Sequence, residues 1–407
     1  MNSLYKFYCR TFQTAVRLAI PLLPYRDPEI LGSVSDVPSK LAEKGIDSVL
    51  IVTDGVINKL SVMDTLKRAL TDGNIRYAVY AGTVPNPTVE NVEEARRVYL
   101  RNKCDAIIGF GGGSAIDCAK AVGARIARPG KTVPQMEGVM KVVLGTPFFV
   151  AIPTTSGTGS EVTLTTVITD GKSGHKFTVN DFALIPDVAV LDAENMKTMP
   201  PSVTSATGMD ALTHAVEAYI GRSTTRSTRS DAMEAVWLIF GNIEKAYLDG
   251  NDTEARENMM KASFLAGRAF SRSYVGYVHA VAHSLGGRYN IPHGLANAVF
   301  LPILLEAYGE NVHKKLHELA VAAGISDECE SDEEGALKFI SAVKDMNGRM
   351  NIPKKLTGIK DEDIELMAEY AAKEANPMYP VPVIMDKKTI EQFYYRVADR
   401  SENEHED

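Results

Sequence analysis

The chain has 407 residues, of which 45% are hydrophobic and 24% are charged, and its formal net charge is −8. This length exceeds the roughly 250–300 residues that one hydrophobic core can serve, so we expect two domains. An acidic chain without a run of Lys or Arg argues against a nucleic-acid partner. Its four cysteines are widely spaced and form no CxxC pair. That pattern is typical of reduced thiols in a cytoplasmic protein, and we expect that location.

The N-terminal segment, residues 1–26, contains four basic residues and no acidic one. This charge pattern is compatible with a targeting peptide, but Arg17 interrupts the apolar run, which is also too short to span a bilayer and lacks an A-x-A-like cleavage site. Apolar residues of "LYKFYCRTFQTAVRLAI" recur at helical spacing, so we predict an amphipathic helical extension that ends near Pro21. A peripheral membrane role is the weaker alternative, and we expect no membrane partner.

The first half of the chain alternates strand-like runs with helical patterns. Strands are predicted at 48–54, 75–82, 104–110, 148–155 and 188–193. Helices are predicted at 60–73 and 88–103. Strands that alternate with helices indicate βαβ units and a parallel sheet with helices on its faces.

The pattern changes after about residue 199. Residues 203–407 contain long amphipathic segments and few β-branched runs, and Pro200 and Pro201 stand where helices commonly begin. We therefore predict an α/β nucleotide-binding domain over residues 1–198 and a helical domain over residues 199–407.

A glycine cluster follows the strand predicted at 104–110. Gly111, Gly112 and Gly113 form a turn without Cβ atoms, against which a ligand can lie. Ser114 can cap the helix that follows, whose N-terminus favours a phosphate. Asp117 is expected in the first turn of that helix, where a carboxylate is favourable in any case. A tight turn before a capped helix explains the same residues without a ligand, and the full dinucleotide pattern GxGxxG is absent.

A second loop, "AIPTTSGTGSEVT" (151–163), follows another predicted strand. Its hydroxyl groups suit a pyrophosphate or a sugar, although loops of this composition often bind nothing. They belong to Thr154, Thr155, Ser156, Thr158 and Ser160. Two such loops at the carboxyl ends of parallel strands meet where an open sheet usually binds its ligand, so we expect a nucleotide there. Asp54 ends an early strand and favours NAD over NADP, because a carboxylate binds ribose hydroxyls and repels a 2′-phosphate. Capping of its own turn explains Asp54 equally well.

The helical half contains one acid and several histidines at suggestive spacings. Asp210 and His214 are four residues apart in one helical segment, as are His279 and His283 in another, so each pair projects from one face. His293 follows in "NIPHG". Carboxylate and imidazole groups from separate segments suit a divalent transition metal, whose open positions would let it polarise an alcohol or carbonyl oxygen. A local salt bridge, a surface histidine pair and a closed structural metal site are the alternatives, although structural sites normally favour cysteines.

These motifs together resemble those of the iron-containing (group III) alcohol dehydrogenases. The resemblance runs from about residue 28 to 400 and rests on "GGGSAIDCAK", "PTTSGTGSEVT", "GMDALTHAVEAY" and "HAVAHSLGGRYNIPHGLANAVFLP", in that order. It implies the fold that this family shares with dehydroquinate synthases. That fold has an α/β dinucleotide-binding domain with a parallel sheet, an all-α C-terminal domain, and an active site in the cleft between them.

The resemblance also implies individual site residues. The implied metal ligands are Asp210, His214, His279 and His293, with Fe²⁺ as the cation and Zn²⁺ or another divalent metal as the alternative. His283 is then a nearby histidine that is not a ligand and can pass protons. The implied cofactor contacts are Asp54, Asn86, Gly112, Gly113, Ser114, Asp117, Thr154, Thr155, Thr158 and Lys176. Thr165 and Phe270 correspond to substrate-pocket positions.

The implied activity is reversible hydride transfer between a small primary alcohol or diol and NAD, with NADP less expected and an aldehyde or ketone as the product. The expected partner is this small molecule, and assembly into a homo-oligomer is left open. Enzymatic alternatives are a dehydroquinate synthase-like and a glycerol dehydrogenase-like enzyme. The former needs several basic residues for a phosphate-bearing substrate, and the metal segments contain only Arg288. A nucleotide-binding sensor is the non-enzymatic alternative.

Overall fold

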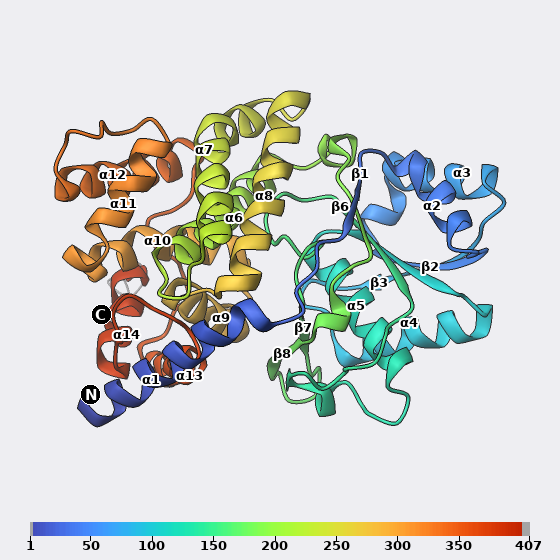
Figure 1. Cartoon of the computed structure of the whole chain (residues 1–407), viewed down its shortest axis with the longest axis horizontal. Helices are drawn as coiled ribbons and strands as arrows, with labels where there is room; N and C mark the ends of the chain where they lie inside the picture. The colour runs from blue at the N-terminus through green and yellow to red at the C-terminus, as the bar shows by residue number, and fades with distance from the viewer. Residues whose placement is uncertain (1–2, 401–407) are drawn as a thin grey trace. The chain divides into compact units, whose positions relative to one another are not determined.

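The computed structural model describes residues 3–400 and divides them into two compact units (Figure 1). An α/β unit comprises residues 24–199, and a helical unit combines residues 200–400 with residues 3–23 at the start of the chain. The sequence-based division had placed residues 1–26 with the α/β domain. The structure corrects that assignment for residues 3–23, whereas residues 24–26 lie in the α/β unit as expected.

A six-stranded parallel sheet forms the centre of the α/β unit. Its spatial order is β1 (Glu29–Leu31), β9 (Val188–Val190), β6 (Phe148–Pro153), β4 (Ala106–Gly111), β2 (Ser48–Asp54) and β3 (Arg76–Thr83). The residues of β4 are all buried, as are those of β2 except its last. Strands covered on both faces read as continuous apolar runs, which is why the sequence predicted these two so directly.

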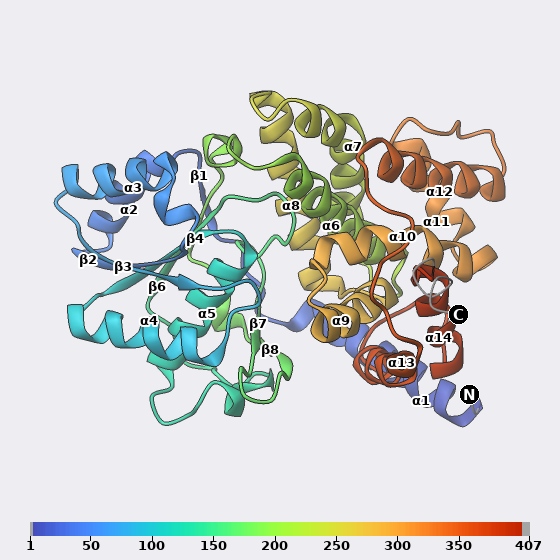
Figure 2. The same cartoon turned by 180° about the vertical axis from the view of Figure 1, so that it is seen from behind.

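Helices cover both faces of this sheet (Figures 1 and 2). They are α2 (Val37–Glu43), α3 (Ser61–Asp72), α4 (Val89–Asn102) and α5 (Gly113–Ala127). Neighbouring residues of β2 point to opposite sides: Leu50 belongs to the apolar core that includes α4 and α5, whereas Ile51 belongs to the core that includes α2 and α3. The predicted parallel sheet with helices on its faces is confirmed.

A small second sheet was not predicted from the sequence. It consists of β5 (Gly138–Val139), β8 (Lys176–Asn180) and β7 (Thr165–Thr169), of which β7 and β8 pair antiparallel. Residues in β7 and β8 alternate between buried and half-buried positions over only five residues each. Such short strands depend on a distant partner for their stability, so local sequence carries a weak signal for them.

The helical unit is built from long helices, as predicted. They are α1 (Ser3–Ala19), α6 (Pro201–Ile220), α7 (Arg226–Leu248), α8 (Thr253–Ser273), α9 (Tyr277–Tyr289), α10 (His293–Tyr308), α11 (His313–Ala322), α12 (Asp332–Arg349), α13 (Asp361–Ala375) and α14 (Lys387–Val397). Helix α6 packs against α7, α8 and α10, and most of its residues are buried. A helix enclosed in this way can carry polar side chains into the interior of the unit, where its neighbours must satisfy them.

The predicted N-terminal helix is confirmed, and it is attached to the helical unit. Arg10 donates hydrogen bonds to the carbonyl oxygens of Val381 and Pro382, both at 2.7 Å, and Gln13 donates to that of Tyr379 at 2.7 Å. Cys9, on the same side of α1, is fully buried. These contacts explain why residues 3–23 belong with residues 200–400.

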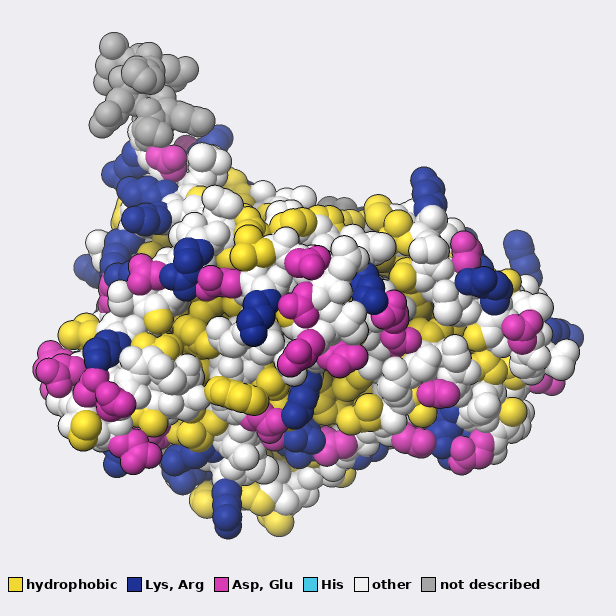
Figure 3. Space-filling view, turned by 90° about the horizontal axis from the view of Figure 1, so that it is seen from above, with side chains coloured by type: hydrophobic (Ala, Val, Ile, Leu, Met, Phe, Trp, Pro, Cys, Tyr) yellow, Lys and Arg dark blue, Asp and Glu magenta, His cyan; other side chains and the backbone are white. Residues whose placement is uncertain are grey.

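The surface of the described residues mixes charges of both signs. On the face drawn in Figure 3, Lys and Arg side chains lie interspersed with Asp and Glu. Among residues 3–400, none of the helices combines the length and the low polarity that crossing a bilayer requires. The four cysteines are free thiols, and Cys329 is the exposed one among them.

Candidate functional site

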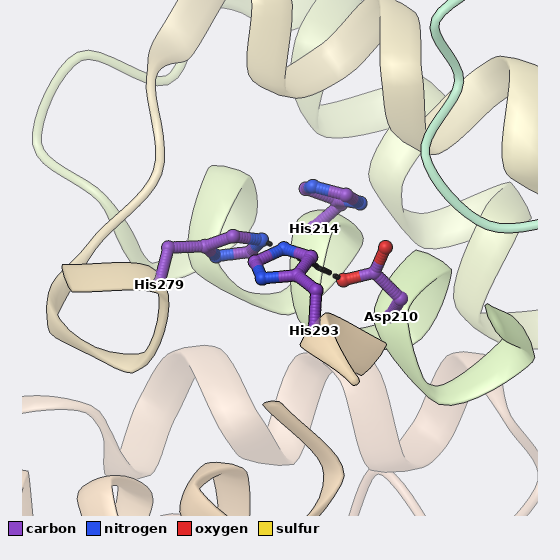
Figure 4. A group of neighbouring side chains, drawn as sticks. All are labelled: Asp210, His214, His279 and His293. Carbon is purple, nitrogen blue, oxygen red and sulfur yellow. Dashed lines mark ion pairs between the residues drawn. The ribbon is translucent and has the colours of Figure 1, made fainter. Parts of the chain in front are cut away.

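Four side chains from three helices converge inside the helical unit (Figure 4). Asp210 and His214 lie one turn apart on α6, His279 lies on α9, and His293 is the first residue of α10. Their candidate ligand atoms, one from each residue, all lie within 4.8 Å of one another. Three of the side chains are buried and His293 is half-buried. The cluster is therefore largely enclosed, and His293 is its most exposed member.

A glycine allows α10 to begin close to α6. A Cβ atom on Gly294 would overlap the carbonyl oxygen of Ala206 and would lie 2.7 Å from its carbonyl carbon. Only glycine permits this approach without moving one of the two helices. The approach brings His293 Nε2 to 3.4 Å from Asp210 Oδ1.

The chemistry of the cluster fits a divalent cation. His279 Nε2 is buried without a hydrogen-bond partner among the described residues, and it lies 3.9 Å from Asp210 Oδ1, which is too far for a hydrogen bond. Leaving such an atom unpaired costs about 1–3 kcal/mol, a cost that coordination would remove. Burial, reinforced by nearby His283, holds the pKa of His279 well below its usual value. The imidazole is therefore neutral, which is the form that binds metals.

A buried carboxylate that sequence reasoning missed supports His279 from behind. Glu217, on α6, lies 2.6 Å through Oε2 from His279 Nδ1, and it accepts hydrogen bonds from the backbone N–H groups of Gly276 and Val278, both at 2.8 Å. Burial raises the pKa of the Glu217 carboxyl to about 7, while the backbone donors oppose that rise. The sequence could have indicated this residue, because Glu217 follows His214 by three positions and so lies on the same side of the predicted helix.

A second missed residue, Asn297, contacts two of the candidate ligands. This side chain is fully buried on α10, one turn after His293. Its amide nitrogen lies 2.6 Å from Asp210 Oδ1 and 3.1 Å from His293 Nε2. Asn297 therefore helps to fix the orientation of both side chains.

The structure places His283 beside the cluster but outside the group of four. Its ring stacks on that of His293, with ring centroids 5.0 Å apart, and its Nδ1 atom lies 2.6 Å from Glu374 Oε1. Glu374, on α13, also accepts a hydrogen bond of 2.7 Å from the Tyr379 hydroxyl. The hydrogen-bonded pair of Glu374 and Tyr379 thus orients the His283 ring.

The two candidate substrate residues belong to different units. Phe270, on α8, is half-buried and stacks on His214, with ring centroids 4.1 Å apart and an angle of 14° between the planes. Thr165, the first residue of β7, is half-buried and donates a hydrogen bond of 2.7 Å to Asn180 Oδ1. Phe270 therefore lies against the metal-ligand candidates, and the hydroxyl of Thr165 is engaged within its own sheet.

In the α/β unit, the two loops predicted to bind a nucleotide pack against each other. A Cβ atom on Gly113 would lie 2.7 Å from Thr158 Cγ2, and one on Gly112 would lie 3.5 Å from Thr155 Cγ2. The backbone N–H of Thr154 donates to the carbonyl oxygen of Gly111 at 3.0 Å. The glycines thus allow a close approach that places hydroxyl groups next to the N-terminus of α5.

Two local expectations for this region are wrong. Gly112 is the N-cap residue of α5 and makes no side-chain cap bond, so Ser114 lies within the first turn and does not cap the helix. Asp117 lies beyond the first turn and is buried, where its carboxylate accepts hydrogen bonds from the Ser160 hydroxyl at 2.8 Å and the Val167 N–H at 2.9 Å. The reason is that Gly113 already adopts helical geometry, which starts the helix earlier than a serine cap would.

Of the remaining predicted cofactor residues, Asp54 and Asn86 lie at the carboxyl ends of neighbouring strands, and Lys176 is the first residue of β8 in the small sheet. Asp54 ends β2, and its Oδ1 caps its own turn by accepting hydrogen bonds from Val56 and Ile57 at 2.8 and 2.9 Å. Asn86 follows β3 and accepts a hydrogen bond of 2.9 Å from Lys176 Nζ. Because β3, β2, β4 and β6 are adjacent in the sheet, Asp54, Asn86 and the two loops gather at one edge, the carboxyl edge.

Comparisons with known proteins agree with this arrangement. Residues 31–193 match the iron-containing alcohol dehydrogenase family, and residues 204–398 match the C-terminal part of the Fe-containing alcohol dehydrogenase family. Alcohol dehydrogenase 4 of Saccharomyces cerevisiae is 38% identical over 348 residues, which cover 84% of this chain and 89% of that protein. The NAD-dependent methanol dehydrogenase of Bacillus methanolicus is 35% identical over 345 residues, covering 84% and 90%.

A solved structure shares the fold. The crystal structure of a 1,3-propanediol oxidoreductase matches with a TM-score of 0.88 at 35% identity, covering 92% of this chain and 99% of that one. Family matches, relatives and structure thus span both units. The chain belongs to the iron-containing alcohol dehydrogenase family, and it is an oxidoreductase that acts on alcohols.

Proposed function

We propose that the chain interconverts a small primary alcohol or diol and the corresponding carbonyl compound, with NAD as the hydride carrier. The observation that carries this proposal is the convergence of the four candidate ligand atoms within 4.8 Å. The names of a similar methanol dehydrogenase and a similar 1,3-propanediol oxidoreductase favour small alcohols and diols. A cytoplasmic location and assembly into a homo-oligomer stay predictions.

In this proposal Asp210, His214, His279 and His293 hold one divalent cation. When bound, such a cation supplies Lewis acidity toward the substrate oxygen. Nitrogen and oxygen ligands accept either Fe²⁺ or Zn²⁺, and the intrinsic affinity order favours Zn²⁺, so occupancy by iron would depend on its availability. Burial of three of the four side chains limits the access of water to the reacting centre.

His283 is proposed to move the proton that the alcohol loses. Its Nδ1 atom lies 2.6 Å from the carboxylate of Glu374, which accepts a hydrogen bond from that nitrogen and leaves Nε2 to exchange a proton with substrate or solvent. Tyr379 donates to the same carboxylate oxygen and keeps it in place. Phe270, stacked on His214, would offer an apolar surface to the carbon chain of a small substrate.

The α/β unit is proposed to bind the nucleotide through the loops after β4 and β6. The first turn of α5 offers backbone N–H groups to a pyrophosphate, and Thr155 and Thr158 lie next to it. A carboxylate at Asp54 favours NAD over NADP at the ribose. The reported name of the Bacillus methanolicus relative supports the same choice.

The test compares His279→Ala with His175→Ala, a change to an exposed histidine of the α/β unit. Metal content and NADH absorbance would be measured on a panel of short alcohols and aldehydes, with NAD or NADP and with added iron or zinc. We expect His279→Ala to lose metal and turnover while nucleotide affinity is largely kept. His175→Ala should behave like the original protein. Full metal content and turnover in His279→Ala would refute the assignment.

A further inference from the structure

We propose that Glu217 is a positioning residue for the cation site, which holds His279 in one tautomer and one ring orientation. The proposal rests on the proposed function, since it assigns a role toward the same cation. It concerns a side chain that approaches the site from behind and makes no contact with substrate.

Three donors converge on the Glu217 carboxylate. Oε2 receives the Gly276 N–H at 2.8 Å and lies 2.6 Å from His279 Nδ1, and Oε1 receives the Val278 N–H at 2.8 Å. All three donors come from the first turn of α9 and its N-cap residue, Gly276, which has no side chain to cap the helix. A carboxylate from α6 therefore does the capping, where the helix dipole also favours a negative charge.

This contact decides which nitrogen of His279 carries the proton. The N–H groups of Gly276 and Val278 stabilise the ionised form of the Glu217 carboxyl, which accepts hydrogen bonds and donates none. The 2.6 Å contact with Nδ1 therefore places the proton on that nitrogen. Nε2 is then the atom with the free lone pair. This Nε2 atom is buried, has no hydrogen-bond partner among residues 3–400, and lies 3.9 Å from Asp210 Oδ1. A carboxylate behind a metal-binding histidine commonly fixes its tautomer in this way.

Gly276 makes the approach of the carboxylate possible. A Cβ atom on this residue would lie 2.6 Å from Glu217 Oε1 and 3.1 Å from its Cδ. Any larger residue would push the carboxylate away from the first turn of α9, and His279 Nδ1 would lose its acceptor. The two residues therefore depend on each other: Glu217 supplies the carboxylate from α6, and the absence of a side chain at Gly276 lets this carboxylate reach the start of α9.

The decisive variant is Glu217→Gln in the full chain. Both carboxylate oxygens accept hydrogen bonds, so either orientation of the glutamine amide places its NH₂ group against at least one N–H donor. Asp231→Asn is the matched control. It breaks another buried carboxylate contact of the helical unit, the bidentate pair with Arg268 at 2.7 and 2.9 Å, which involves none of the four candidate ligands.

Two measurements separate positioning from a merely structural role. The first is the low-field proton signal of His279 Nδ1–H in metal-free protein, assigned by its loss in His279→Ala. The second is the dissociation constant for Zn²⁺ and Co²⁺ by competition with a chromogenic chelator. We expect Glu217→Gln to shift or lose the signal and to bind metal about 10–100-fold more weakly, as is usual for the loss of such a partner. Asp231→Asn should lower thermal stability and leave the signal and the metal affinity unchanged.

Should Glu217→Gln fail to fold, Gly276→Ala provides the same test, because it keeps the carboxylate and only displaces it. The proposal is overturned if the folded variant keeps both the original Nδ1–H signal and the original metal affinity. A wild-type protein that binds no metal would overturn the proposed cation site instead. The Nδ1–H signal in that metal-free protein would still report on the Glu217 contact, so the two failures are distinguishable.

Discussion

Replacing Gly294 by alanine should disturb the candidate metal centre without touching any candidate ligand. The new Cβ would lie 2.7 Å from the carbonyl carbon of Ala206, where ordinary contacts begin at 3.4 Å. Backbone cannot rotate out of the way, so the start of α10 must move from α6 by roughly 1 Å, and overpacking of this kind costs about 1–3 kcal/mol. Metal–ligand distances tolerate only about 0.2 Å, so His293 would leave the reach of a cation held by Asp210.

The assay is a Zn²⁺ and Co²⁺ titration together with thermal unfolding of the metal-free protein. We expect at least tenfold weaker metal binding and a melting temperature lower by several degrees, since about 1 kcal/mol corresponds to roughly 2–4 °C for a unit of this size. Gly241→Ala in α7 is the control, because its Cβ would meet nothing within 4 Å. It should gain about 0.5–1 kcal/mol and keep its metal affinity. Unchanged affinity and stability in Gly294→Ala would refute the requirement for close helix approach.

Three further outcomes are expected. Gly113→Ala should weaken NADH binding severalfold in a fluorescence titration while metal content stays the same, because its Cβ would lie 2.7 Å from Thr158 Cγ2 and separate the two loops. Glu161→Gln should flatten the dependence of thermal stability on pH. Burial raises the pKa of Glu161 from 4.5 to about 7, so the folded state binds the extra proton and the original protein loses stability as pH rises from 4.5 to 7. A thiol reagent should titrate one cysteine, Cys329, in the native protein and all four after denaturation, and reaction of a second thiol in the native state would contradict the burial of the others.

The central sheet could be predicted because burial leaves a local signature. Strands β2 and β4 are enclosed on both faces, and enclosure requires the unbroken apolar runs that the sequence displays. Strand β1 spans only three residues, two of them exposed, and its identity as a strand comes from pairing with β9 far along the chain. Strands β7 and β8 likewise form by pairing with each other in antiparallel orientation, so the local sequence of either one does not predict a strand.

Helical spacing was sufficient to bring Asp210 and His214 together, but the starts of helices were harder to predict. Ser114 was expected to cap α5 because serine is a common cap residue, whereas Gly112 occupies that position with extended backbone. Attachment of α1 to the helical unit depends on Arg10 and Gln13, which bond to backbone carbonyls more than 360 residues away. Every residue has a backbone carbonyl group, so the sequence around residues 379–382 gives no sign that the side chains of α1 bind there.

The choice between His279 and His283 shows why spacing alone cannot assign roles in this site. Both histidines lie on α9, four residues apart, and each has a carboxylate oxygen 2.6 Å from its Nδ1 atom. Neither their spacing nor their hydrogen bonds therefore distinguish the metal ligand from the proton carrier. They differ in their surroundings: the side chain of His279 is 2% exposed and that of His283 is 23% exposed. Desolvation therefore bears much more heavily on His279, which suits a neutral ligand, whereas His283 keeps the access to solvent that a proton carrier needs. Spacing within α9 therefore cannot separate the two roles: the family resemblance assigns them, and the packed structure supplies the physical reason.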